Sequence, residues 1–188
     1  MRILIALIVF VLSLSAYADQ INDALSFINK GKPQEALTIL DKMENDPEAL
    51  YLKSFIYSNE KSELYDPEKY KEFLIKAGDA GYMQAYMEAG NFYMNGYKSF
   101  KRDYDKAYEY LSKAYNNGFK DAGINMAILL MAGKGVEKDV DKGITVLEDV
   151  AESGNPTALT VLGLTYYKDR YLTGTGKRLL SFSKKELN

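Results

Sequence analysis

The sequence contains no cysteine and no histidine. A chain without these residues has no thiol or imidazole nucleophile, no imidazole general base and no disulfide, and it lacks the usual ligands of a structural zinc site. Its folded state must therefore be stabilised by packing alone. These absences also remove the commonest catalytic and metal-binding groups from consideration.

Neither sign of charge dominates the chain. Lys and Arg total 24 against 26 Asp and Glu, which gives a net charge of -2. Proteins that bind nucleic acids or anionic membranes usually carry a basic excess, so we expect no nucleic-acid partner. The 188 residues, of which 47% are hydrophobic, are enough for one folded domain with a continuous core.

The first 18 residues have the pattern of a secretory signal peptide. Arg2 supplies the positive start, residues 3–14 form an apolar stretch, and Ala16-Tyr17-Ala18 is a small-x-small cleavage site. The apolar stretch is shorter than the ~20 residues that span a bilayer, although an uncleaved anchor remains an alternative. We therefore expect cleavage after Ala18, a periplasmic or secreted mature domain at 19–188, and no stable membrane anchor.

The remainder of the chain repeats with a period of 36 or 37 residues. Alanine recurs at positions 49, 85, 122 and 158, and a tyrosine or leucine follows each one eight residues later. A period in the mid-thirties indicates stacked helix pairs. Small residues let helices approach closely, and glycines end each helix in a left-handed cap. Because one pair cannot bury its own apolar face, the pattern predicts an elongated, curved solenoid.

Helix starts can be placed from three Asx-Pro pairs, Asp46-Pro47, Asp66-Pro67 and Asn155-Pro156. Their side chains can accept hydrogen bonds from free amides while proline fixes the first helical angle. The apolar periodicity places the other helices. The predicted helices are 20–30, 33–43, 47–58, 67–79, 83–95, 104–116, 120–132, 140–152, 156–168 and 176–186.

The repeated motif resembles that of the Sel-one-like repeat (SLR) family, within the tetratricopeptide-like superfamily. Residues 122–166 fit best, since Gly133-Lys134-Gly135-Val136 with Asp139 resembles the family's Gly-x-Gly-Val-x-x-Asp turn. The preceding repeat departs from it at residues 97–100. The resemblance implies an all-α, right-handed α-α superhelix of about four to five helix-turn-helix repeats. Its parts would be a divergent cap pair at 19–45, repeats at 46–168 and a C-terminal cap at 169–188.

Two features of the sequence could be mistaken for a catalytic or ligand-binding site. Aspartates at helix openings could be read as a paired-carboxylate or calcium site: Asp103, Asp105, Asp139 and Asp141. We interpret Asp105 and Asp141 as helix-capping residues, because a negative charge is favourable at a helix N-terminus. The turns at 133–135 and 174–176 lack the Gly-Lys-Ser/Thr ending of a phosphate loop. We expect no enzyme, no cofactor and no metal, and the resemblance brings no catalytic residues.

Partner-binding residues are predicted on the first helix of each pair. Counting the recurring alanine as position one, positions four and seven should face a concave groove. They are Leu52, Phe55, Glu88, Asn91, Asn125, Ile128, Val161 and Leu164, with one charge among eight. Such an apolar and amide-bearing strip is typical of a protein-binding surface. If the register is off by one, some of these belong to the core. Three aromatics are further candidate contacts: Tyr86, Tyr97 and Phe100.

These features predict an exported, non-enzymatic protein that binds another protein. The resemblance implies two roles within that class. One is an immunity protein that neutralises an antibacterial effector delivered by type VI secretion, and the other is a periplasmic regulatory or envelope-assembly adaptor. A glycan or peptidoglycan hydrolase is a remote third reading, because it needs two carboxylates ~5 to 10 Å apart and the strip offers only Glu88.

Overall fold

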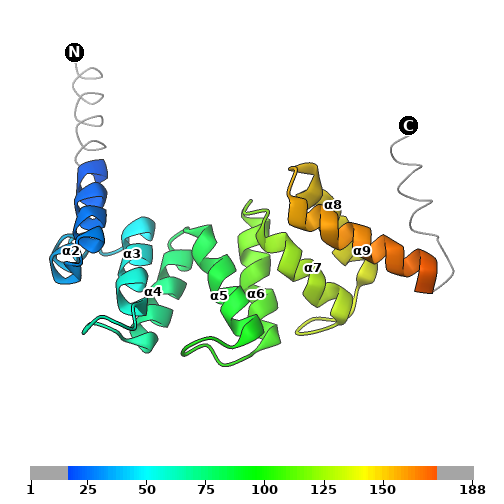
Figure 1. Ribbon diagram of the computed structural model, residues 1–188, viewed down its shortest axis with the longest axis horizontal. Helices are drawn as coiled ribbons and strands as arrows, with labels where there is room; N and C mark the ends of the chain where they lie inside the picture. Colours follow the sequence, from blue (N-terminus) through cyan, green and yellow to red (C-terminus); the bar gives the residue numbers. More distant parts are fainter. Residues whose placement is uncertain (1–16, 173–188) are drawn as a thin grey trace, which may run out of the picture. The chain divides into compact units, whose positions relative to one another are not determined.

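The computed structural model describes residues 17–172, and their regular secondary structure is helical except for one isolated bridge between Tyr97 and Phe100 (Figure 1). Residues 17–29 belong to α1. The other helices are α2 (Pro33–Leu40), α3 (Pro47–Ser58), α4 (Pro67–Asp79), α5 (Met83–Asn95), α6 (Tyr104–Asn116), α7 (Ala122–Ala132), α8 (Val140–Glu152) and α9 (Pro156–Leu172). The predicted all-α helical repeat is confirmed. Most of the predicted signal peptide and the predicted helix 176–186 lie outside the described residues.

The chain divides into two compact units, which are described separately below. Unit 1 comprises Met1–Phe92 and Gly96–Lys101, and unit 2 comprises Tyr93–Asn95 and Arg102–Asn188. Consecutive helices pack on each other in both, most extensively α3 on α4 and α7 on α8. These are the helix pairs that the sequence period predicts. No helix within residues 17–172 is both long and apolar enough to cross a membrane.

The Asx-Pro prediction is confirmed at all three helices. The side chain of Asp46 accepts a hydrogen bond from the Ala49 amide at 2.8 Å, and Asp66 and Asn155 cap α4 and α9 in the same way. Proline follows each of them at the first helical position, where no amide hydrogen is needed. The composition of these three segments therefore determines where the helices begin.

Two other helices are capped by different aspartates from those predicted. Asp103 accepts from the Lys106 amide at 3.1 Å, and Asp139 accepts from the Lys142 amide at 2.8 Å. Asp105 and Asp141 lie in the first turn, where their charge still faces the positive end of the helix dipole. The predicted negative charge at these helix openings is confirmed, whereas the side-chain hydrogen bonds of the cap come from Asp103 and Asp139, two positions earlier.

Several helix bounds also differ from the prediction, beginning with the first helix, which includes residues 17–29 instead of 20–30. Helix α2 ends at Leu40 rather than 43, because Lys42 and Met43 donate hydrogen bonds to carbonyls three residues earlier and so tighten the turn. Helix α7 begins at Ala122 instead of 120, and α9 runs to Leu172 instead of 168. The turn after α2, rather than the apolar pattern, therefore sets the end of that helix.

Glycine is required at Gly135, in the turn that resembles the family motif. Its φ is +69°, and a Cβ added there would overlap the main chain of Tyr104 at the start of α6. Gly133 ends α7 in the left-handed conformation, with φ 66°. This turn can therefore lie against α6 only because position 135 has no side chain.

The recurring alanines form the centre of the packing. All four are fully buried: Ala49, Ala85, Ala122 and Ala158. The bulky residues eight positions later are also buried, except for the half-buried Tyr57. In unit 1, α1 and α2 share a hydrophobic cluster with α3, which contributes Leu52 and Ile56. The divergent first pair is thus part of a continuous core.

Tyrosine hydroxyls donate to carboxylates where helices of unit 2 meet. Tyr115 donates to Asp149 at 2.6 Å, and Tyr166 donates to Glu148 at 2.8 Å. Lys120 also pairs with Asp149. The hydrogen bonds from Lys120 and Tyr115 hold the pKa of the Asp149 carboxyl below its ordinary value, whereas burial and the bond to Asp149 raise the pKa of Tyr115 to about 12.

Candidate functional site

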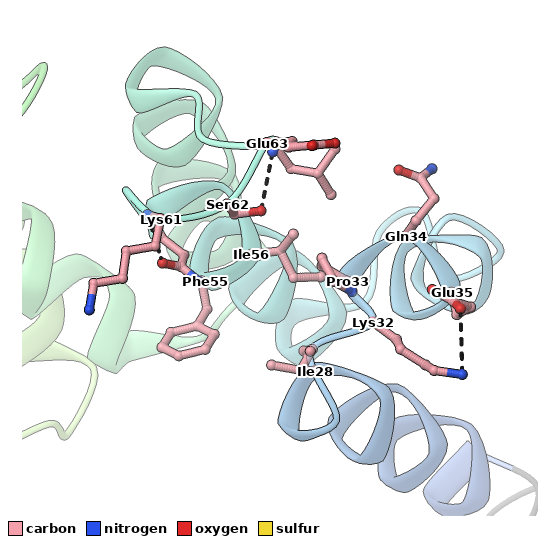
Figure 2. A pocket seen from close by; sticks show the side chains of 13 residues that line it. Ile28, Lys32, Pro33, Gln34, Glu35, Phe55, Ile56, Lys61, Ser62 and Glu63 are labelled. Carbon is pink, nitrogen blue, oxygen red and sulfur yellow. Dashed lines mark hydrogen bonds and ion pairs between the residues drawn. The ribbon is translucent and has the colours of Figure 1, made fainter.

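A groove of about 690 Å³ lies in unit 1 between the α1–α2 turn and the end of α3 (Figure 2). One wall comes from residues 28–35, where Gly31 adopts a left-handed turn and Pro33 starts α2. The other wall comes from Phe55 and Ile56 on α3 and from residues 59–64 after it. Residues far apart in the sequence therefore form one concave surface.

Phe55 is the main exposed apolar group of this groove. It lies in the last turn of α3, and 55% of its surface is accessible to solvent. Figure 2 shows its ring on one side of the groove, with Ile28 and Pro33 on the opposite side. Together with Leu64 these residues give the groove an apolar floor. An exposed aromatic ring beside a concave surface is a common anchor for protein partners.

The second wall of the groove, formed by the end of α3 and residues 59–64, is called the α3–α4 wall. It is held by short-range hydrogen bonds. The Lys61 amide donates to the Asn59 side chain at 3.1 Å, and the Leu64 amide donates to the Ser62 hydroxyl at 3.1 Å. Such side-chain bonds to nearby amides are typical of turns that do not continue a helix. The wall is therefore largely preformed, and a bound partner would need to order few residues of it.

Charge is balanced around the groove, because its rim carries two lysines and two glutamates: Lys32, Glu35, Lys61 and Glu63. The Lys32 ammonium and the Glu35 carboxylate are 4.0 Å apart and both exposed, so the pair contributes little to stability. Within residues 17–172, no group of three or more His, Cys, Asp or Glu could hold a metal ion. The groove can contribute apolar contact with a polar rim.

The predicted site residues of unit 1 fall into different environments. Phe55 lines the groove, whereas Leu52 is buried in the α1–α3 hydrophobic cluster. The expectation that Leu52 faces a partner is wrong, because α1 and α2 cover that side of α3. Asn91 is half-buried and already takes part in an interaction. The strip predicted on α3 therefore reduces to Phe55.

Glu88 is held in a polar network inside unit 1. The Tyr51 hydroxyl donates to its Oε1 at 2.7 Å, and the Gln84 amide donates to the same oxygen at 3.0 Å. The Tyr82 ring stacks on Tyr51 with 4.5 Å between centroids. Burial, and then the bond to Glu88, raises the pKa of Tyr51 above its ordinary value. This carboxylate joins α3 to α5.

The three aromatic residues predicted to contact a partner also differ in their burial. Tyr86 is buried, and its ring occupies the space where a side chain at Gly78 would lie. Phe100 is buried against Tyr70 and Phe92, with ring centroids 6.1 Å and 5.4 Å away. The prediction that these two contact a partner is wrong, because they fill the core. Tyr97 is exposed and stays a candidate.

The predicted residues of unit 2 lie on α7 and α9. Asn125, Ile128 and Val161 are half-buried, and Leu164 is 65% exposed. Asn125 also has an interaction within the protein. Of these four, Leu164 offers the largest apolar surface to solvent. Their role in binding stays a prediction.

Solved structures share this arrangement of helices, although no protein-family model matches the sequence. A Sel1 repeat protein from Oxalobacter formigenes is 28% identical, with a TM-score of 0.65 over 78% of this chain and 60% of its own. Cysteine rich protein B of Helicobacter pylori is 26% identical, with a TM-score of 0.52 over 65% of this chain and 94% of its own. The chain has the Sel1-like repeat (SLR) fold.

The chain also matches in fold a protective antigen of uropathogenic Escherichia coli that displays an SLR fold. The two are 24% identical, with a TM-score of 0.62 over 70% of this chain and 28% of the antigen. The chain thus spans 60% of the Oxalobacter protein and 28% of the antigen. It shares the fold with the cysteine-rich Helicobacter protein although it has no cysteine itself.

The turn at 97–100 is where the chain departs from the Sel1-like repeat motif that it otherwise resembles. Lys98 has a φ of 50°, which is positive although the residue is not glycine, and its side chain is only 7% exposed. Its ammonium donates to the Ser58 carbonyl and lies 3.6 Å from the Glu60 carboxylate. It also lies 5.3 Å from the centroid of each of three rings: Tyr65, Tyr70 and Tyr97.

Sequence reasoning missed this lysine and the α3–α4 wall of the groove. The Ser99 hydroxyl donates to the Pro67 carbonyl at 2.6 Å, so two consecutive side chains fix the turn to the segment around α4. The available signal was the tyrosine-rich composition around an irregular loop, which is compatible with a lysine held by aromatic rings. The signal for the wall was the Asn59 to Ser62 segment, typical of a turn.

Proposed function

We propose that this Sel1-like repeat protein is an exported, non-catalytic module that binds another protein through the groove at Phe55. Its partner would be an antibacterial effector, which it neutralises as an immunity protein. The observation that carries the proposal is the exposed Phe55 ring beside a preformed groove with an apolar floor and a charge-balanced rim. This surface suits a polypeptide better than a nucleic acid, which would require a basic excess.

Burial of the Phe55 ring by a partner can supply enough binding free energy for Phe55 to act as an anchor residue. Covering ~100 Å² of its exposed apolar surface would contribute about 2.5 kcal/mol at ~25 cal/mol per Å². That value lies within the range of a binding hot spot, where a few well-packed residues supply most of the affinity. The two flanking turns leave few torsions to be ordered on binding, so little of this energy is lost.

The immunity role is supported by the sequence. A secretory pattern at residues 1–18 would bring the chain to the compartment where periplasmic effectors act. The chain carries no cysteine or histidine for catalysis, and an inhibitor needs none because it acts by occupying its target. The fold supplies a scaffold for a binding surface, and the function depends on the side chains exposed on it.

The test takes the proteins encoded by the genes adjacent to this one as toxin candidates, each directed to the periplasm of a host that also expresses this protein. We expect the wild type to restore growth, and Phe55→Ala to reduce affinity for the toxin by about 30-fold or more, which corresponds to ~2 kcal/mol. Affinity would be measured with purified proteins by calorimetry. Melting of the variant should be unchanged, because Phe55 is mostly exposed.

Leu164→Ala is the matched comparison, because Leu164 occupies the same repeat position in unit 2 and is 65% exposed. Its affinity should equal that of the wild type. Equal losses for both variants would contradict the assignment to the Phe55 groove. Growth that this protein does not restore, with a toxin that it does not bind, would contradict the immunity role.

A further inference from the structure

The α3–α4 wall of the groove gains little stability from burial. Four of the six residues at positions 59–64 are exposed: Asn59, Glu60, Lys61 and Glu63. The Asp66 amide joins the ends of this loop by donating to the Tyr57 carbonyl at 3.1 Å, but the hydrogen bonds between those ends span only two or three residues. Exposed backbone with so few buried contacts opens easily. The shape of the wall therefore depends on contacts from outside the loop.

One ammonium from a distant turn contacts this loop on both sides. The Nζ atom of Lys98 donates to the carbonyl of Ser58, the residue that ends α3, and lies 3.6 Å from the Glu60 carboxylate. It also lies 5.3 Å from the centroid of the Tyr65 ring. Ser58 directly precedes residues 59–64 and Tyr65 directly follows them. The contacts of a single nitrogen atom therefore enclose the loop.

Lys98 has two features that are unfavourable for a lysine. Its φ of 50° is positive, a conformation that a residue with a Cβ rarely adopts. Its side chain is only 7% exposed, although an ammonium loses its hydration when it is buried. Such features persist only where the surrounding structure compensates for them. Here the compensation comes from Ser58, Glu60 and the surrounding tyrosine rings.

The turn that carries Lys98 is attached to α4. The Ser99 hydroxyl donates to the carbonyl of Pro67, the first residue of α4, at 2.6 Å. Tyr70 of the same helix is buried, and its ring centroid lies 5.3 Å from the Lys98 ammonium. Helix α4 packs extensively on α3. Lys98 therefore connects the exposed wall to a packed helix pair.

We propose that Lys98 is a positioning residue for the Phe55 groove, because its ammonium holds the α3–α4 wall in the shape that a partner binds. The inference rests on the proposed function, since a partner must occupy the groove. A wall that is ordered before binding loses less conformational entropy when the partner docks. Lys98 thus raises the affinity of the groove without touching the partner, and the turn at 97–100 contributes to a surface that it does not line.

The first test needs no partner. Lys98→Met removes the ammonium but keeps the length and apolar stem of the side chain. We expect amide hydrogen exchange at Lys61 and Leu64 to rise about tenfold more than at Lys32, because Lys32 belongs to the opposite wall and its amide bonds to the Phe27 carbonyl at 2.9 Å. Lys101→Met is the matched control, because Lys101 is exposed in the same loop. Its exchange should equal that of the wild type.

The comparison of the two walls separates positioning from a general loss of stability. A general loss raises exchange in both walls, whereas loss of the Lys98 contacts acts on one of them. An equal rise at Lys32, Lys61 and Leu64 would therefore overturn the proposal. Unchanged exchange at Lys61 and Leu64 would overturn it too.

The second test measures affinity for the protein encoded by an adjacent gene that the wild type binds. Calorimetry is done at a temperature where every variant has wild-type helicity. We expect Lys98→Met to bind about tenfold more weakly than the wild type, and Lys101→Met to bind equally well. In a chain that already carries Phe55→Ala, adding Lys98→Met should weaken binding by no more than about twofold, because the wall then positions a groove without its anchor.

A tenfold loss in both backgrounds would overturn the proposal, because the two residues would then act independently. Wild-type affinity of Lys98→Met would overturn it as well. The failure of the proposed function gives a different result: the wild type would bind none of the proteins encoded by adjacent genes. The exchange experiment would still decide whether Lys98 orders the wall.

Discussion

Replacing Lys98 by methionine tests whether its ammonium fixes the irregular turn at 97–100. Lys98→Met keeps the length and the apolar stem of the side chain but removes the charge and its hydrogen bonds. The change leaves the Ser58 carbonyl without the donor that reaches it from 40 residues away. It also removes the cation from the three tyrosine rings. We therefore expect the turn to open and unit 1 to lose stability.

The expected loss follows from the separate interactions. A hydrogen bond from a charged donor contributes ~1.5 to 3 kcal/mol, and a buried cation over aromatic rings contributes up to ~2 kcal/mol. The ion pair with the exposed Glu60 adds little. Removing the desolvation cost of the lysine offsets part of this sum. A net loss of about 2 kcal/mol would lower Tm by about 4 to 8 °C in a chain of this size.

Thermal unfolding followed by circular dichroism measures this change, with Lys101→Met as the control because Lys101 is exposed in the same loop. The control should alter stability by less than about 0.5 kcal/mol. Amide hydrogen exchange should also rise at Tyr97 and Phe100, whose main chains bond to each other at 3.0 and 2.8 Å. Equal melting of the two variants would refute the role given to Lys98.

Three further predictions concern packing and pH. Phe100→Ala should lower the free energy of unfolding by about 3 to 5 kcal/mol in denaturant titrations, because the ring is fully buried, and a loss below ~1 kcal/mol would contradict its placement. Gly135→Ala should lower Tm more than Gly154→Ala. Both glycines have a positive φ, but only the Cβ at position 135 would overlap the main chain of Tyr104. Equal losses of Tm would refute that contact. Asp149→Asn should lower Tm at neutral pH. Because the folded-state pKa of Asp149 is depressed, its stabilisation is fully present above the ordinary value of 3.8 and is lost as pH falls through the folded value. The Tm gap to the wild type should therefore close in acid, and a constant gap would contradict the argument.

The sequence period predicts helix positions well because the close packing of helices allows only a small residue at the first repeat position. Alanine at the first repeat position is fully buried in all four repeats, including Ala49 and Ala158. Any larger side chain there would separate two helices. The Asx-Pro starts are equally local, since Asp46 bonds to an amide only three residues away. Features determined by adjacent residues can be read from the sequence.

Exposure could not be predicted in the same way, because it depends on which neighbour covers each direction. Helical spacing gives the direction in which Tyr86 points, but its burial follows from the space left by Gly78 on α4. Leu52 is covered by α1 and α2, which the sequence identifies as a divergent pair without showing how far they reach. The turn at Lys98 depends on residues 40 positions away. Long-range contacts decide these sites.

Burial separates the roles of two phenylalanines in the same unit. Phe100 is fully buried, so its apolar surface already contributes to the stability of the fold. Phe55 keeps 55% of its surface in water, so most of its energy is available only to a contact that the isolated chain does not make. Truncating Phe100 should therefore lower stability, whereas truncating Phe55 should leave stability almost unchanged and lower affinity for a partner. At the repeat position where the other members are Asn91, Ile128 and Leu164, the aromatic ring beside the groove is the side chain best suited to binding.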